Sequence, residues 1–351
     1  MTDQSLPVLW SRPLHLRSSD MTLAAAAGAL VVAERHSRLA RLDPQTGTLL
    51  WEQRVEDCWG TTVITGERCL YLSQAGVLHC FDMYSGQQTW SVPDLRLRGY
   101  VSVSGSVVLL GGWRGYRPLL RLDLMNGERL PAPTSGLPPG SGLAWPLPVR
   151  MSPEQGFGAD AVLIANDTQA KLSLVDARTG FPRGEWSLPA PVRFPDHGSA
   201  YSVAEDGRIV FLSGTRTVMA LHPRDGVEVL WQHDGDLPSG PPILAGRRLW
   251  LVTGVGVTMI DLDRGGRSDV QHLPLGNTRG GVPVSGGALL VRVDAYLIAV
   301  DQAGEIVARL RLPGRVDRLV SDGRSLVHAI GKGHLSTIDI SAMSAVSGCM
   351  P

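Results

Sequence analysis

The sequence predicts an all-β protein, an eight-bladed β-propeller whose blades are four-stranded antiparallel sheets. Three observations predict it. A pattern of Asp, Gly and Trp recurs about every forty residues, two further apolar runs precede each copy, and the two ends of the chain complement each other. We therefore expect residues 1–351 to form a single propeller domain.

The repeat is clearest where LARLDPQTGTLLW at 39–51 returns as LHCFDMYSGQQTW at 78–90. Successive copies of its Asp lie 39, 41, 53, 46, 39, 40 and 38 residues apart, so seven intervals define eight repeats. A His takes the place of the Asp in the fifth repeat. The positions are Asp43, Asp82, Asp123, Asp176, His222, Asp261, Asp301 and Asp339.

The Asp and Gly of each repeat predict a hairpin turn between the third and fourth strands of a blade. An Asp that opens a tight turn can accept hydrogen bonds from backbone N–H groups two residues on. The Gly supplies a positive φ that other residues adopt only at a cost. The clearest pairs are Asp43 with Gly47, Asp82 with Gly86, and Asp176 with Gly180.

The Trp that follows the turn is expected on the fourth strand, where a large aromatic side chain can fill the seam between neighbouring blades. These residues are Trp51, Trp90, Trp186 and Trp231. The first two strands of a blade are predicted from the apolar runs before the Asp. Examples are 61–66 and 68–76 in the second repeat, and 241–246 and 247–256 in the sixth.

The two ends of the chain predict how the ring closes. The last repeat ends at GCMP without a fourth strand or Trp, whereas the N-terminal LPVLWSRPL carries Trp10 without a preceding Asp turn. Residues 6–16 are therefore expected to supply the outer strand of the last blade.

The cysteines are predicted to be free thiols. A hairpin turning at 74–76 pairs residue 72 with 78 and 70 with 80, which places Cys69 and Cys80 on opposite faces of the sheet. No spacing of Cys and His typical of a zinc site occurs, so no metal is expected.

Composition excludes several classes of protein. The formal net charge is zero, which argues against a dedicated nucleic-acid binder. The most apolar run, 21–33, is too short to span a bilayer, and the N-terminus has no signal-peptide pattern. We expect a soluble cytoplasmic protein with no membrane association.

The segments RLDPQTGTLLW (41–51), CFDMYSGQQTW (80–90) and LVDARTGFPRGEW (174–186) resemble the tryptophan-docking repeats of the pyrroloquinoline quinone (PQQ)-like β-propellers. This family includes quinoprotein dehydrogenases and non-catalytic propellers of the BamB type. The chain lacks the adjacent cysteine pair of the dehydrogenases and an evident Glu/Asn/Asp calcium set. The resemblance therefore implies a non-catalytic propeller, with neither PQQ nor calcium expected as a cofactor.

Candidate binding residues are expected at one end of the channel, where the loops between second and third strands meet the links between blades. Arginine and aromatic side chains at such a place suit a binding surface. Trp59 could instead fill the centre of the ring as core, and for Trp113 the two interpretations are evenly balanced. The candidates are Trp59, Arg98, Trp113, Arg114, Tyr116, Asp167, Arg279 and Asp294.

Three functions follow, in order of preference. The first is a non-catalytic scaffold that holds a protein partner, since no catalytic residues are evident in the sequence. The second is a propeller that binds or senses a small ligand such as PQQ, and the third is a quinoprotein-like oxidoreductase. The sequence identifies neither the partner nor the oligomeric state.

Overall fold

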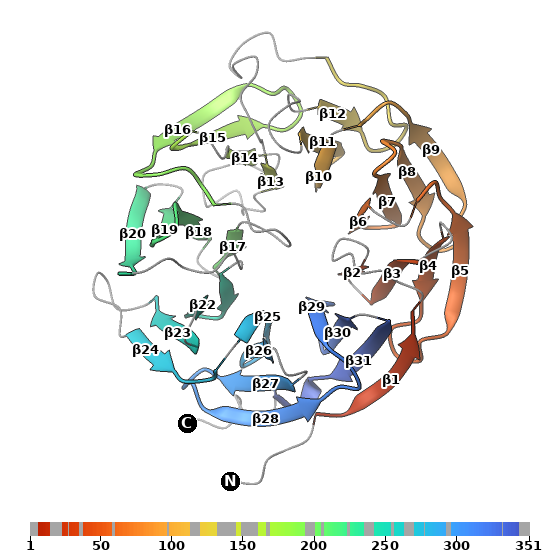
Figure 1. The fold of residues 1–351 in the computed structure, drawn as a ribbon. Helices are drawn as coiled ribbons and strands as arrows, with labels where there is room; N and C mark the ends of the chain where they lie inside the picture. The colour runs from red at the N-terminus through yellow and green to blue at the C-terminus, as the bar shows by residue number, and fades with distance from the viewer. Residues whose placement is uncertain are drawn as a thin grey trace.

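The computed structural model is a closed ring of eight antiparallel sheets, each forming one blade (Figure 1). It describes residues 6–14, 23–26, 28–34, 38–57, 60–96, 98–112, 120–131, 145–148, 161–165, 169–193, 201–204, 207–222, 225–234, 242–253, 256–262, 270–276, 278–292, 296–331 and 333–343. The first strand of each blade lies nearest the centre of the ring. The prediction of an eight-bladed propeller is confirmed.

The first four blades follow the chain in order. Blade 1 consists of β2 (Leu23–Ala26), β3 (Ala29–Glu34), β4 (Arg38–Leu42) and β5 (Leu49–Arg54). Blade 2 consists of β6 (Gly60–Thr65), β7 (Arg68–Ser73), β8 (Leu78–Asp82) and β9 (Gln88–Val92). Blade 3 consists of β10 (Arg98–Ser104), β11 (Val107–Gly112) and β12 (Leu120–Asp123). Blade 4 consists of β13 (Trp145–Pro148), β14 (Ala161–Ala165), β15 (Lys171–Asp176) and β16 (Pro182–Ser187).

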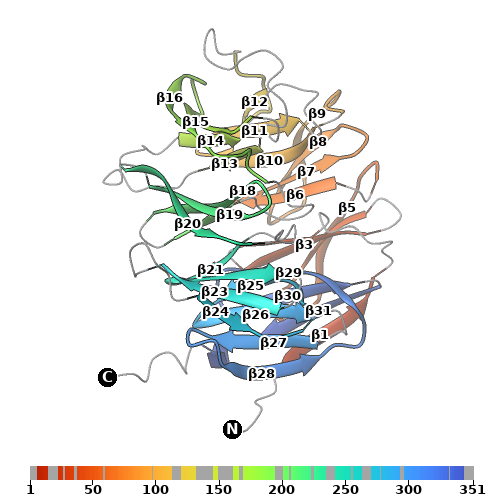
Figure 2. The ribbon, with the colours of Figure 1, turned by 60° about the vertical axis from the view of Figure 1, so that its left-hand side comes forward.

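The other four blades complete the ring, as the turned view in Figure 2 also shows. Blade 5 consists of β17 (Tyr201–Val203), β18 (Ile209–Ser213), β19 (Thr217–His222) and β20 (Gly226–Gln232). Blade 6 consists of β21 (Ile243–Ala245), β22 (Arg248–Thr253), β23 (Gly256–Asp261) and β24 (Val270–Leu273). Blade 7 consists of β25 (Thr278–Val284), β26 (Gly287–Arg292), β27 (Tyr296–Asp301) and β28 (Ile306–Arg311). Blade 8 consists of β29 (Val316–Ser321), β30 (Leu326–Gly331), β31 (His334–Asp339) and β1 (Val8–Pro13).

The N-terminal strand closes the ring as predicted. Strand β1 pairs antiparallel with β31 as the outer strand of blade 8 (Figure 1). Backbone bonds extend the pairing at both ends, from the Asp339 amide to the Pro7 carbonyl at 3.0 Å and from the Leu14 amide to the Gly333 carbonyl at 2.8 Å. The first and last segments of the chain are thus one sheet.

The register of blade 2 confirms the expectation for the cysteines. Leu72 pairs with Leu78 and Leu70 with Cys80, while Cys69 lies opposite Phe81. Both Cys69 and Cys80 are buried free thiols, and they pack into the seams on opposite sides of the blade. Burial strongly raises the pKa of the Cys69 thiol, so it stays protonated at neutral pH.

Blade 3 differs from the other blades in the described part of the chain. Where its fourth strand would begin, the described residues form only two contacts. One is an isolated bridge between Leu122 and Arg129, and the other is a bond from the Leu130 amide to the Arg121 carbonyl at 2.9 Å. Pro131 follows at once, and a proline cannot donate to a strand ladder.

The hydrophobic core lies in the seams between blades rather than at the centre of the ring. Each of eight buried clusters draws its residues from two neighbouring blades, with blade 8 and blade 1 sharing the last. Within the described residues no helix has the length and hydropathy to cross a bilayer.

The ring has two distinct ends. At the turn end, the first-to-second and third-to-fourth strand turns of a blade touch, as in the 2.8 Å bond from the Met83 amide to the Glu67 carbonyl. At the loop end, the second-to-third strand loop meets the links between blades, as in the 2.7 Å bond from the Leu95 amide to the Gly76 carbonyl. The predicted convergence of loops and links is therefore present in blade 2.

Candidate functional site

Most of the predicted binding residues cannot be placed. Six of them lie outside the residues that the structure describes: Trp59, Trp113, Arg114, Tyr116, Asp167 and Asp294. The other two, Arg98 and Arg279, lie near the loop end of blades 3 and 7. These blades are four positions apart in a ring of eight, so the structure does not bring Arg98 and Arg279 together.

Arg98 and Arg279 lie in strands, whereas the sequence placed them in loops. Strand β10 begins at Arg98, and β25 begins one residue before Arg279. Both strands start with a register shift, between Arg98 and Tyr100 in one and between Thr278 and Gly280 in the other. A bulge of this kind breaks the two-residue alternation by which a strand is recognised in a sequence.

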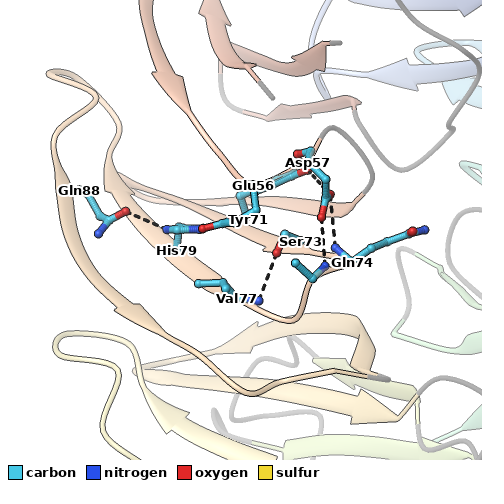
Figure 3. A network of polar contacts seen from close by, with 9 residues as sticks. Glu56, Asp57, Tyr71, Ser73, Gln74, Val77, His79 and Gln88 are labelled. Carbon is cyan, nitrogen blue, oxygen red and sulfur yellow. Dashed lines mark hydrogen bonds and ion pairs between the residues drawn. The ribbon is translucent and has the colours of Figure 1, made fainter. Parts of the chain in front are cut away.

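The best-described part of the loop end is held by Asp57, in the link between blades 1 and 2 (Figure 3). Its carboxylate accepts the Ala75 amide at 3.0 Å and the Gln74 amide at 3.4 Å. Its carbonyl accepts the hydroxyl of the buried Tyr71 at 2.6 Å. Since Gly76 is bonded to the next link, the loop of blade 2 is tied to the links on both sides.

Beside Asp57, Glu56 reaches the buried His79 on β8 (Figure 3). The Glu56 carboxylate oxygens lie 2.8 and 2.9 Å from His79 Nε2, and Gln88 Oε1 lies 2.8 Å from Nδ1. Both ring nitrogens thus face oxygen acceptors, and the ring stacks on Phe81 at a centroid distance of 5.7 Å. No local motif in the sequence indicated this cluster, because the partners of His79 lie 9 and 23 residues away.

A second polar cluster joins the closing strand to blade 1. Glu34 is 2% exposed, and its carboxylate lies 3.3 Å from Arg12 on β1 and also pairs with Arg38. Arg38 further pairs with Glu52 at 2.8 Å, and this pairing with Glu34 and Glu52 raises the pKa of the guanidinium. The buried charge of Glu34 is compensated from both blades, so closure of the ring leaves no unpaired charge at this place.

The repeat residues have the structural role that the sequence predicts. Asp43 Oδ1 accepts the amides of Gln45 and Thr46 at 2.8 Å each, and these bonds lower the pKa of the carboxyl group. Asp82 and Asp176 accept the corresponding amides of their own turns, with pKa values also lowered. The turn glycines adopt positive φ: Gly47 (70°), Gly86 (72°) and Gly180 (75°).

Three of the tryptophans dock their blade onto the turn of the next blade. The indole Nε1 donates to the carbonyl one residue after the repeat Asp: Trp10 to Pro44 at 2.9 Å, Trp51 to Met83 at 2.8 Å and Trp90 to Leu124 at 3.1 Å. The rings also cover Gly47, Gly86 and Gly127, where an added Cβ would lie 2.8 Å from an indole carbon. Trp186 lies against Gly226 more loosely, and Trp231 packs in the seam between blades 5 and 6.

The carbonyl that follows the repeat Asp accepts from a second donor, an arginine, which was not predicted from the sequence. Arg41, two residues before Asp43, donates to the Met83 carbonyl beside Trp51. Arg121, two residues before Asp123, is 5% exposed and donates to the carbonyls of Ala177, Arg178 and Pro131. The signal was the R-L-D triplet, which reads as an exposed position of an alternating strand.

Among the described residues, exposed apolar side chains gather at the turn end. Nine large apolar side chains of the described chain are exposed, and seven of them lie at or beside the repeat turns of blades 8 and 1–4. These seven are Val8, Leu9, Leu49, Leu50, Tyr84, Met125 and Phe181.

Blade 5 carries a hollow of about 410 Å³ at the turn end, lined by both acidic and basic side chains. His222 Nδ1 lies 2.9 Å from Asp225, and Arg208 lies 3.6 Å from Glu228. The groups compensate one another. Within the described residues, no group of three or more His, Cys, Asp or Glu side chains is placed to hold a metal ion.

The fold and its docking residues define a β-propeller of the PQQ-like class. The family model of the outer membrane protein assembly factor BamB matches residues 7–127 and 35–268, which is most of the chain. The chain therefore belongs to this family. No curated protein sequence matches it significantly.

Solved structures show the same fold. BamB from Moraxella catarrhalis has a TM-score of 0.72 and 17% identity, covering 96% of this chain and 98% of its own. Sqt1 from Saccharomyces cerevisiae has a TM-score of 0.71 and 9% identity, covering 96% and 100%. The quinohemoprotein alcohol dehydrogenase from Comamonas testosteroni has a TM-score of 0.67 and 12% identity, covering 96% and 76%. At these identities the likeness concerns the fold alone.

Proposed function

We propose that the chain is a non-catalytic scaffold that binds a protein partner at the loop end of the ring. The observation that carries the proposal is the fixed loop of blade 2, held by Asp57 on one side and by Leu95 on the other. A surface that is already ordered loses little conformational entropy when a partner binds. Membership of the BamB family supports a scaffold, since the family's name describes an assembly factor.

Capture of the partner on the purified full-length chain tests the proposal. The tagged protein is incubated with lysate of its source organism, and stoichiometric partners are quantified by mass spectrometry. The substitution Asp57→Ala frees the amides of Gln74 and Ala75, so we expect it to reduce capture. Tyr84→Ser is the matched control at the turn end, where Tyr84 is 68% exposed, and it should leave capture unchanged.

Two results would contradict the proposal. One is the absence of any stoichiometric partner. The other is a partner lost with Tyr84→Ser and retained with Asp57→Ala, which would move binding to the apolar turn end. Calorimetric titration with PQQ and calcium decides the small-ligand alternative, because binding heat would favour a ligand-binding propeller over a protein scaffold.

A further inference from the structure

The repeat turn of blade 3 contains a chemically reactive pair of residues, Asn126 and Gly127. In blades 1, 2 and 4 the residue before the turn glycine carries a hydroxyl instead, at Thr46, Ser85 and Thr179. Those hydroxyl oxygens accept the amide two residues on, at 3.3, 3.2 and 3.4 Å. Asn126 Oδ1 accepts the Glu128 amide in the same way, at 3.0 Å. The blade 3 turn therefore has the same geometry, with a carboxamide where the others have a hydroxyl.

An Asn that precedes a Gly can deamidate. The backbone nitrogen of the Gly loses its proton and attacks the Asn Cγ, so that a new C–N bond closes a succinimide ring and ammonia leaves. Water then opens the ring to aspartate or to isoaspartate. The absence of a Cβ on Gly favours the attack, because neither bulk nor backbone restriction opposes ring closure. Asn126 is the asparagine of this chain that precedes a glycine, since Asn166 and Asn277 are followed by Asp and Thr.

The folded turn opposes this reaction. The Gly127 amide donates its hydrogen to the Asp123 carbonyl at 2.9 Å, so the attacking nitrogen is already engaged. Gly127 is buried under Trp90, where an added Cβ would lie 2.8 Å from a ring carbon. The indole Nε1 of Trp90 also donates to the Leu124 carbonyl at 3.1 Å. The Asn126 side chain itself is exposed to water. Ring closure therefore requires the turn to separate from Trp90.

From these contacts we propose that Asn126 is a deamidation site that the docking of Trp90 protects. The reaction is slow while the seam between blades 2 and 3 is closed, and it proceeds when the seam opens and frees the Gly127 amide. Isoaspartate adds a methylene group to the main chain, so Gly127 no longer lies opposite the Asp123 carbonyl. Opening of this seam is thereby recorded in the covalent structure, and the seam stays weakened.

Peptide mapping of the aged full-length protein tests the proposal. Trypsin cleaves after Arg121 and Arg129, so residues 122–129 form one peptide that contains the site. Mass spectrometry follows its deamidation in a mildly alkaline buffer, with and without enough urea to unfold the chain. We expect deamidation to be at least about tenfold slower in the folded protein, because it proceeds only from the open seam. The variant Asn126→Ser should show no deamidation of this peptide.

A pair of tryptophan variants tests whether this seam sets the rate. Trp90→Ala uncovers Gly127, so without urea we expect deamidation to be more than about tenfold faster. Trp231→Ala is the matched control, because Trp231 packs in the seam between blades 5 and 6. It should change the rate by less than about twofold. Circular dichroism checks that both variants are folded.

Three results would overturn the inference. They are the absence of deamidation at Asn126 in the unfolded chain, equal rates in the folded and unfolded protein, and equal acceleration by the two tryptophan variants. If Trp90→Ala does not fold, the comparison with and without urea still decides, because it uses the unmodified protein.

Discussion

Two seams of the ring use different hydrogen-bond donors for an equivalent carbonyl of the repeat. They are the seam between blades 1 and 2 and the seam between blades 3 and 4. At the first seam, the carbonyl after the repeat Asp accepts the Trp51 indole and Arg41. At the second seam, Pro131 stands at the Trp position, and the donor to the equivalent carbonyl of Ala177 within the described residues is Arg121. The comparison teaches that the repeat preserves an acceptor on the turn, while the donor opposite it can change.

The two donors stabilise their seams in different ways. Trp51 is 8% exposed and packs against the turn at Gly86, so it contributes burial of a large apolar surface as well as one hydrogen bond. Arg121 contributes hydrogen bonds at the cost of desolvation, and its burial lowers the pKa of the guanidinium. The first seam should therefore be stronger.

The substitution Trp51→Ala should have the largest effect. It removes a buried aromatic side chain, so we expect the free energy of unfolding to fall by about 3–5 kcal/mol. Urea unfolding followed by tryptophan fluorescence and circular dichroism measures the loss. Trp51→Phe keeps most of the packing and removes the Nε1 donor, so it should cost about 1 kcal/mol. Equal losses for the two variants would show that the hydrogen bond, and not burial, holds the seam.

The pair Arg121→Met and Arg41→Met compares the two seams directly. Arg121→Met leaves the buried carbonyls of blade 4 without a donor, and we expect a loss of about 2–3 kcal/mol in the free energy of unfolding. Arg41→Met should cost less than about 1 kcal/mol, because Trp51 still donates to the Met83 carbonyl. If Arg41→Met were the more damaging change, the idea that Arg121 replaces the missing Trp would be wrong.

Alanine substitutions at two glycines with positive φ distinguish the effect of tryptophan docking from the effect of backbone strain. Gly66 (φ 54°) has no atom within 4 Å of an added Cβ, whereas at Gly86 (φ 72°) that Cβ would lie 2.8 Å from the Trp51 ring. Ala should cost about 1–2 kcal/mol at either position through strain. Gly86→Ala should cost about 1–2 kcal/mol more, because Trp51 must move. Melting temperatures that agree for the two variants would rule out close docking at Gly86.

A third seam, between blades 8 and 1, contains a buried histidine that makes the stability of the fold depend on pH. His328 is fully buried on the same face of β30 as Ile330, with Nδ1 2.8 Å from Thr337 Oγ1. Burial lowers its pKa to about 4, against a smaller opposing effect of Asp322. As the pH falls below about 6.5, the unfolded chain takes up the proton first, so His328 makes the fold less stable down to about pH 4.

This dependence can be measured between pH 6.5 and 5.5, where His328 should reduce the free energy of unfolding by about 1 kcal/mol. The variant His328→Gln should lose that slope, and His272→Gln, at an exposed position of β24, should keep it. An identical slope in the His328→Gln variant would assign the pH dependence to other groups.

The ring could be predicted from the sequence because most repeats contain the same Asp and Gly turn residues. Asp43 and Gly47 can be recognised from neighbours a few residues away, and the unmatched Trp10 and last repeat locate the closing strand. The docking arginines could not be predicted. Arg121 sits in an alternating strand where an exposed side chain is expected, and only the seam between blades 3 and 4 shows that carbonyls surround it.

The loop end was harder to predict, since its contacts join residues far apart in the chain. Glu56 and His79 belong to a link and a strand that meet only in the folded ring. Arg98 and Arg279 were predicted in loops but lie in strands, because a bulge at the start of each strand interrupts the alternating pattern. The remaining six candidates lie outside the described residues and stay predictions.

Hydrogen exchange measured by mass spectrometry on Arg121→Met tests most directly whether each seam is held by its own donor. If so, exchange should rise in peptides of β11, β12 and β15 and stay unchanged in β4, β5, β7 and β8 around Trp51. A uniform rise around the whole ring would contradict the account, because the propeller would then open as one unit, whichever seam is weakened.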